Sequence, residues 1–100
     1  MNFRYNSRAE SELWDAALYY ESHRPQLGIR FLNAVDAGLA AILDHPRRWP
    51  EIDAGIRRYR LERFPYALVY RQVADDVVEI IAVTHLRRRP GYWQDRLEQA

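Results

Sequence analysis

The feature that most constrains the fold is a change in hydrophobic period about halfway along the chain. Up to Asp44, apolar residues recur at helical spacing, whereas from Ile56 onward apolar and polar residues alternate or form short apolar runs. The first pattern is typical of amphipathic helices and the second of strands. Helices followed by a run of strands indicate an α+β architecture.

Two helices are predicted in the first half. Ser7-Arg8-Ala9-Glu10 matches a capping box, so the first helix is expected to begin at Ser7 and to end near His23. Pro25 suits the first turn of a second helix, because the N–H that proline lacks has no helical partner there. Apolar residues from Leu32 to Ile42 give this helix its buried stripe. The two helices are therefore expected to form a hairpin.

Four strands complete the predicted order β-α-α-β-β-β. They cover residues 2–6, 56–64, 66–72 and 77–84, with a proline-containing loop at 45–50 and a turn at 74–76. The last strand is apolar on both faces, which predicts a central place in the sheet. We expect the helical hairpin on one face of a small, mainly antiparallel sheet, a more polar second face, and a short C-terminal helix or tail.

The composition fits a single domain spanning residues 1–100. Its 48% hydrophobic and 29% charged content is ordinary for a globular protein, and no apolar run is long enough to span a bilayer. The N-terminus lacks a secretory pattern and the chain has no cysteine, so we expect a cytoplasmic protein. Three scattered histidines offer no metal site, and the four glycines form no phosphate-binding loop, so no metal or cofactor is expected.

Arginine supplies all 15 basic residues. From Arg47 onward there are 11 arginines against 8 acidic residues, so the second half is the basic one. Guanidinium groups grip phosphate or carboxylate in two places and stack on aromatic rings, which favours anion recognition. A GC-rich genome also favours arginine codons, so the total count alone does not establish a function.

The segment from Arg87 to Trp93 is the strongest candidate for a site. It follows the last predicted strand and would bring three guanidiniums, His85 and two aromatic rings to one end of the sheet, where they could meet a polyanion. An alternative is that Tyr92 and Trp93 fold back over the open face of the sheet, with Arg96 in a short terminal helix. Glu12 and Asp15 are expected to be ordinary surface charges.

The order of elements, the phrase Arg63-Phe64-Pro65-Tyr66-Ala67-Leu68-Val69-Tyr70 and the arginine-rich close together resemble the RelE/ParE superfamily of type II toxin–antitoxin toxins. The resemblance covers nearly the whole chain. It implies a small toxin that is neutralised by a cognate antitoxin and acts either on the ribosome, as an mRNA endonuclease, or on DNA gyrase. The fold alone does not decide between these targets.

The endonuclease branch implies a metal-independent reaction that needs a base, cations and an acid. Matched by position, the catalytic candidates are Arg58, Arg60, Arg87, and Tyr92 or its neighbour Trp93. His85 is a further candidate, because histidine can do acid or base work near neutral pH. Ala67 stands where this branch has an arginine, and alanine supplies neither charge nor proton. Arginine is also a poor base, because guanidinium hardly ever loses its proton. The sequence therefore favours the gyrase-binding branch.

The gyrase branch needs a shaped surface and no catalytic group. Its target-binding residues would be Arg58, Arg60, Arg87, Arg88, Arg89, Tyr92 and Trp93. For Arg58 and Arg60, a solvated strand face balanced by Glu62 is the alternative. Aromatic residues of the first helix, namely Trp14, Tyr19 and Tyr20, are candidates for the antitoxin contact. A non-toxic relict that only binds antitoxin, and assembly as a homodimer or as a heterotetramer with antitoxin, remain open.

Overall fold

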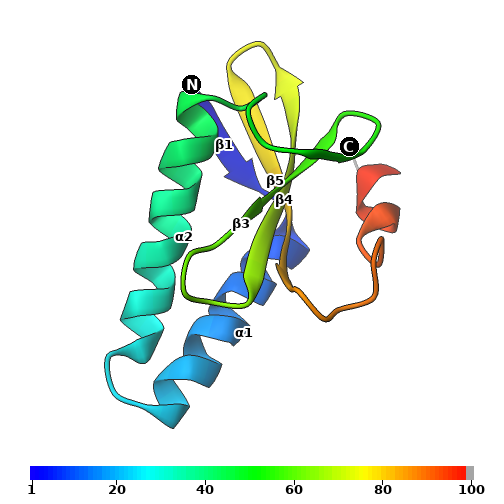
Figure 1. Ribbon diagram of the computed structural model, residues 1–100. Coiled ribbons are helices and arrows are strands. Elements are labelled where there is room, and N and C mark those ends of the chain that lie inside the picture. The colour runs from blue at the N-terminus through cyan, green and yellow to red at the C-terminus, as the bar shows by residue number, and fades with distance from the viewer. Residues whose placement is uncertain (99–100) are drawn as a thin grey trace.

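The computed structural model describes residues 1–98, which form two helices, five strands and a C-terminal 3-10 helix (Figure 1). In chain order the elements are β1 (Asn2–Tyr5), α1 (Ser7–His23), α2 (Leu27–Asp44), β2 (Glu51–Asp53), β3 (Ile56–Arg60), β4 (Tyr66–Ala74), β5 (Val77–His85) and η1 (Gln94–Glu98). The predicted α+β class is confirmed. The short strand β2 was not predicted, because its three residues are too few to establish an alternating pattern.

The five strands form one sheet in the order β1-β5-β4-β3-β2. Only β1 and β5 pair in parallel. Strand β5 has a neighbour on each side, as its apolar sequence predicted, and residues 78–83 are all buried. The register aligns Arg58, Val69 and Ala82 in one row across three strands, and Arg60, Ala67 and Thr84 in the next.

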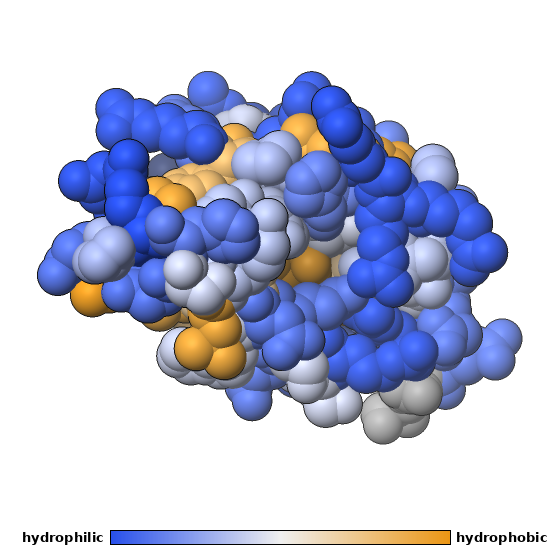
Figure 2. All heavy atoms as spheres, turned by 90° about the horizontal axis from the view of Figure 1, so that it is seen from below, coloured by the Kyte–Doolittle hydropathy of each residue, from blue (hydrophilic) through white to orange (hydrophobic). Residues whose placement is uncertain are grey.

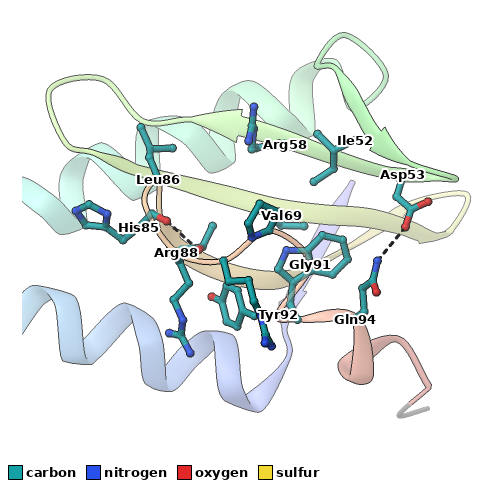
Figure 3. Close-up of a pocket in the computed structure, with 14 residues that line it drawn as sticks. Ile52, Asp53, Arg58, Val69, His85, Leu86, Arg88, Gly91, Tyr92 and Gln94 are labelled. Carbon is teal, nitrogen blue, oxygen red and sulfur yellow. Dashed lines mark hydrogen bonds between the residues drawn. The ribbon is translucent and has the colours of Figure 1, made fainter.

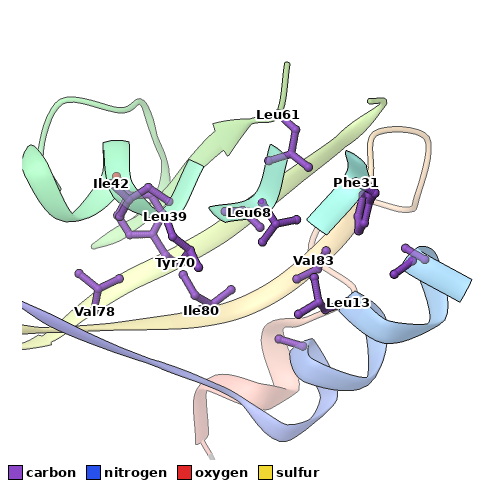
Figure 4. Close-up of a cluster of buried hydrophobic side chains, with 14 residues drawn as sticks. Leu13, Phe31, Leu39, Ile42, Leu61, Leu68, Tyr70, Val78, Ile80 and Val83 are labelled. Carbon is purple, nitrogen blue, oxygen red and sulfur yellow. The ribbon is translucent and has the colours of Figure 1, made fainter. Parts of the chain in front are cut away.

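Both helices lie on the same face of the sheet, and the larger core fills the space between the helices and the sheet (Figure 4). Its largest fully buried side chains include Phe31, Ile42, Leu68 and Tyr70. The helices approach each other closely at Gly28, where a Cβ atom would lie 2.6 Å from the carbonyl oxygen of Ala17. No helix within residues 1–98 is long and apolar enough to cross a membrane.

The second face of the sheet is not simply polar, which corrects the sequence prediction. The C-terminal segment crosses it, and Trp93 packs on Ile56, Val69, Ile81 and Ala82 in a second, smaller apolar cluster. Figure 1 shows this segment on the side of the sheet opposite the two helices. Alternation in β3 predicted one buried face of the sheet, whereas the second face is buried by residues distant in sequence.

One cap and two element ends differ from the sequence prediction. Helix α1 spans Ser7–His23 as predicted, but its N-cap is Asn6, whose side chain accepts the N–H of Arg8 at 2.9 Å. Helix α2 begins at Leu27, because Gln26 before it takes a left-handed conformation with φ 75°. Strand β3 ends at Arg60, before a tight turn in which Arg63 has φ 69°.

Three partly or fully buried tyrosines predict an alkaline transition. Burial is the main cause that raises the pKa of Tyr5, Tyr70 and Tyr92 to about 12, from an ordinary value of 10.0. A phenol whose pKa is higher in the folded state favours folding below the unfolded pKa, and this contribution is lost as the pH rises. The free energy of unfolding should therefore fall between pH 10 and pH 12.

Denaturant unfolding followed by circular dichroism at several pH values measures this loss. Tyr5→Phe removes one of the titrating groups, so its loss of stability over that interval should be shallower than in the wild type. At neutral pH the two proteins should differ little. An equally steep loss in Tyr5→Phe would contradict the assignment to Tyr5.

Candidate functional site

A cavity of about 300 Å³ lies between the second face of the sheet and the C-terminal segment (Figure 3). The sheet contributes Arg58, Val69, Thr84 and His85, and the short strand β2 contributes Ile52 and Asp53. The rest of the lining comes from the segment that follows β5: Leu86, Arg88, Arg89, Pro90, Gly91, Tyr92, Trp93 and Gln94. The cavity therefore lies where the segment from Arg87 to Trp93, the strongest candidate for a site in the sequence, meets the sheet.

Three of the predicted arginines line this cavity. Arg58 points from β3, while Arg88 and Arg89 come from the loop after β5, and all three are exposed. One acid, the exposed Asp53, also lines the cavity, and its carboxylate accepts hydrogen bonds from Gln94 and from the N–H of Ala54. Guanidinium groups from separate β-segments thus converge on one solvent-reachable hollow.

Arg60 and Arg87 do not line the cavity, but they lie close to it. Arg60 is in the cross-strand row beyond Arg58, at the end of the sheet where residues 86–91 leave β5. Both side chains are exposed. Figure 2 views this end of the molecule, where hydrophilic side chains dominate and apolar ones emerge only in separate patches. Arg60 and Arg87 therefore extend the basic surface outward from the cavity.

The two aromatic residues fold back on the sheet, which was the alternative to an exposed pair. Trp93 is only 5% exposed and forms part of the apolar cluster beneath the cavity. Tyr92 is half-buried, and its ring lies 3.9 Å from the guanidinium carbon of Arg88. Trp93 thus offers little surface to a partner, whereas Tyr92 and Arg88 form a stacked pair on the cavity wall.

Glu12 is not an ordinary surface charge, contrary to the sequence prediction. Its carboxylate accepts hydrogen bonds from both terminal nitrogens of Arg96, at 2.8 and 3.1 Å, and from the hydroxyl of Tyr92 at 2.6 Å. It also accepts the backbone N–H of Val83 at 3.1 Å, and Arg88 lies 3.8 Å away. Helix α1 is therefore joined through one carboxylate to β5 and to the C-terminal segment.

This arrangement changes the chemistry that Tyr92 can perform. Burial and the hydrogen bond to Glu12 together raise the pKa of its phenol to about 12. At neutral pH the hydroxyl keeps its proton and donates a hydrogen bond to the carboxylate. Tyr92 consequently contributes a ring surface to the cavity, with its hydroxyl committed to Glu12.

His85 stands at the rim of the cavity in a structural arrangement. Its Nδ1 accepts the backbone N–H of Arg87 at 3.0 Å, so the ring caps the first turn after β5. The same ring packs edge-on against Tyr66, with 5.2 Å between centroids. Ala67, in the row between Arg60 and Thr84, is completely buried and places no functional group on this face.

The three antitoxin candidates on α1 have different surroundings. Trp14 is 52% exposed and Tyr19 is 57% exposed, so both offer apolar surface to a partner. Tyr20 instead packs against the rings of Phe31, Phe64 and Tyr66 beside the core. Leu18 and Ile29, which the sequence analysis did not single out, are also exposed.

Within residues 1–98 no group of three or more histidine and acidic side chains is arranged to hold a metal ion. Asp53 in the cavity lining and Glu12 behind it already have hydrogen-bond partners. Around the cavity the described residues place three guanidinium groups, the rings of Tyr92 and His85, the single carboxylate of Asp53 and a floor formed by Trp93. Such an arrangement is suited to binding an anionic surface.

Comparison with known proteins agrees with this fold. A family model described as the ParE toxin of the type II toxin-antitoxin system, parDE, matches residues 3–90. The chain belongs to the ParE toxin family. A solved structure titled "Chromosomal ParDE TA system from P. aeruginosa" aligns with a TM-score of 0.72 and 17% identity. The alignment covers 85% of this ParE-family chain and 95% of that chain, and at this identity it shows the shared fold. No curated protein matches the sequence.

Proposed function

We propose that this ParE-family toxin acts by binding DNA gyrase, with no chemistry on its own residues, and that it is neutralised in the cytoplasm by a cognate antitoxin. The observation that carries the proposal is the make-up of the cavity. Its cations come from Arg58, Arg88 and Arg89, and guanidinium groups bind anions without exchanging protons near neutral pH. The cavity can therefore hold an anionic part of a target while lacking a base among these groups.

The two proton-transfer candidates near the cavity, Tyr92 and His85, each make an internal hydrogen bond. The Tyr92 hydroxyl is bonded to Glu12, and His85 Nδ1 receives the Arg87 N–H. Ala67 is buried where the nuclease branch would need a cation. A missing transition-state donor costs about 10²–10³ in rate, so these features argue against efficient RNA cleavage.

Purified components test the proposal directly. The toxin is added to DNA gyrase in a supercoiling assay and, separately, to ribosomes translating a defined mRNA. We expect gyrase inhibition with intact mRNA, and in cells DNA damage and filamentation. Cleavage of the mRNA in the ribosomal decoding site, or no effect in either assay, would reject the proposal. An absence of effect in both assays would instead favour a relict that only binds antitoxin.

We further propose that the antitoxin covers the outer surface of the helical hairpin. Trp14 and Leu18 lie four residues apart on α1 and are both more than half exposed, as is Ile29 on α2. Apolar side chains at this spacing suit an amphipathic segment that folds on binding. An acidic segment would also be attracted by the arginine-rich end of the molecule.

Replacing Trp14 and Leu18 with serine should weaken the antitoxin complex and leave gyrase inhibition intact. Truncated aromatic anchors at interfaces cost about 2 kcal/mol or more, which corresponds to at least about 30-fold in affinity. Isothermal titration of the cognate antitoxin into the toxin measures the change. Tyr20→Phe serves as a control, because the Tyr20 ring lies against the core and is retained. Unchanged affinity in the double variant would place the antitoxin elsewhere.

A further inference from the structure

Glu12 is the most highly coordinated side chain next to the cavity, yet it does not line it. Four hydrogen bonds reach its two oxygens, from the Val83 N–H, the Tyr92 hydroxyl and two nitrogens of Arg96. Two of its contacts, Tyr92 and Arg88, do line the cavity. The carboxylate thus sits directly behind the stacked pair on the wall.

The position of Glu12 follows from the sheet. Strand β1 pairs with β5 only as far as Ile80, so the edge of β5 beyond that point lacks a neighbouring strand. The Val83 N–H on this edge is taken by the Glu12 carboxylate from α1. The carboxylate is therefore fixed to the sheet by a backbone group, independently of the C-terminal segment.

Arg88 is held by few contacts. Its side chain is 55% exposed, and within residues 1–98 it makes one cation–π contact, with the ring of Tyr92 at 3.9 Å, and one ion pair, with Glu12 at 3.8 Å. Figure 3 shows this side chain extending from the C-terminal segment toward α1. Because an unrestrained arginine loses considerable rotamer freedom on binding, a partly fixed guanidinium binds an anion at lower entropic cost.

The charges around Glu12 leave the guanidinium of Arg88 available to bind an anion. Arg96 is 95% buried and is committed to Glu12 through two hydrogen bonds, so the two charges balance each other. Arg88 then remains as the surplus cation of the group. Glu12 attracts it from a distance of 3.8 Å, which is long enough to orient the guanidinium without closing a tight ion pair.

We propose that Glu12 is a positioning residue of the cavity, whose carboxylate fixes the Arg88 guanidinium and the Tyr92 ring so that they can bind an anionic group of the target. This inference rests on the proposed function, because it takes the cavity as the target-binding site. Glu12 does not line the cavity, yet under this proposal it controls the affinity of the cavity for an anionic group.

The test uses the direction in which the affinity for an anion changes, because a change of charge and a loss of positioning predict opposite directions. Glu12→Gln removes one negative charge and, by charge alone, should strengthen anion binding. A positioning role of Glu12 predicts instead that Glu12→Gln binds an anion more weakly. Asp15→Asn makes the same charge change one helical turn further along α1, at an exposed residue that has no hydrogen bond or ion pair among residues 1–98. The pair of variants separates charge from position.

Inorganic phosphate is the first probe, followed through the arginine Nε–Hε signals in NMR spectra of the full chain. Glu12→Gln should bind it about tenfold more weakly than the wild type, a change of about 1.4 kcal/mol, and the Arg88 signal should lose its distinct position. Asp15→Asn should bind phosphate equally or slightly more tightly. Equal affinities in Glu12→Gln and Asp15→Asn would overturn the proposal.

Two further measurements distinguish a positioning role of Glu12 from misfolding of the variant and from a wrong choice of target. Tyr92→Phe keeps the ring and the Arg96–Glu12 pair and removes only the hydroxyl contact, so it should fold normally and show a smaller loss in the same direction. Gyrase inhibition by the wild type and Glu12→Gln is then compared at equal folded fractions. No inhibition by the wild type rejects the gyrase target while the phosphate result still judges Glu12. Equal inhibition by both proteins rejects the role of Glu12.

Discussion

Alanine at Arg58, Arg88 and Arg89 together is expected to abolish gyrase inhibition and to leave the protein folded. These three side chains supply the cations of the cavity from two separate parts of the chain. An arginine at the centre of an interface typically contributes about 2 kcal/mol or more, so even two such losses weaken binding by about 10³-fold. Solvent-exposed arginines contribute little to folding, so the melting temperature should change by only a few degrees.

A charge-matched variant serves as the control. Alanine at Arg24, Arg30 and Arg47 removes the same number of exposed guanidiniums from places outside the cavity. It should inhibit gyrase nearly as well as the wild type at physiological salt, where charges beyond about 8 Å are screened. The supercoiling assay compares the two triple variants at equal concentrations. Equal loss in both would mean that net charge, and not the cavity, governs target binding.

Much of the fold was predictable because it depends on local pattern. Helical spacing in the first half and alternation in the second gave the class, the hairpin and the interior place of β5. Some element ends were less accurate, because α2 begins only after the left-handed Gln26 and β3 ends before the turn that contains the left-handed Arg63. Those choices depend on backbone angles that the residue types permit but do not require.

The arginines of the cavity were also predictable, since they cluster in the sequence and strand alternation places Arg58 on the second face. The role of Glu12 was not. It lies 84 residues from Arg96 and 80 from Tyr92, and nothing in the local sequence distinguishes it from Asp15. Only the crossing of the C-terminal segment over the sheet makes it a buried carboxylate. The burial of Trp93 has the same origin, because its partners lie on three different strands.

The Glu12–Arg96 pair leads to the largest expected effect on stability. Arg96→Met keeps most of the side-chain length but leaves the Glu12 carboxylate, which is only 16% exposed, without its closest cation. Breaking a buried pair on one side costs about 3–5 kcal/mol. For a domain of this size each kcal/mol lowers the melting temperature by about 4–8 °C, so a decrease of at least about 12 °C is expected in thermal unfolding.

A double variant shows whether the uncompensated charge causes this loss. Glu12→Gln combined with Arg96→Met removes both charges and keeps an amide oxygen that can accept the Val83 N–H. Replacing both partners of a buried pair is often far less costly than removing one, so the double variant should regain a substantial part of the lost stability. If it melts as low as Arg96→Met alone, the loss arises instead from the hydrogen bond that Arg96 donates to the Ile81 carbonyl at 3.0 Å. Recovery would mean that the uncompensated Glu12 charge, and not the lost contacts of Arg96, destabilises the single variant, and that the C-terminal segment can stay on the sheet without this ion pair.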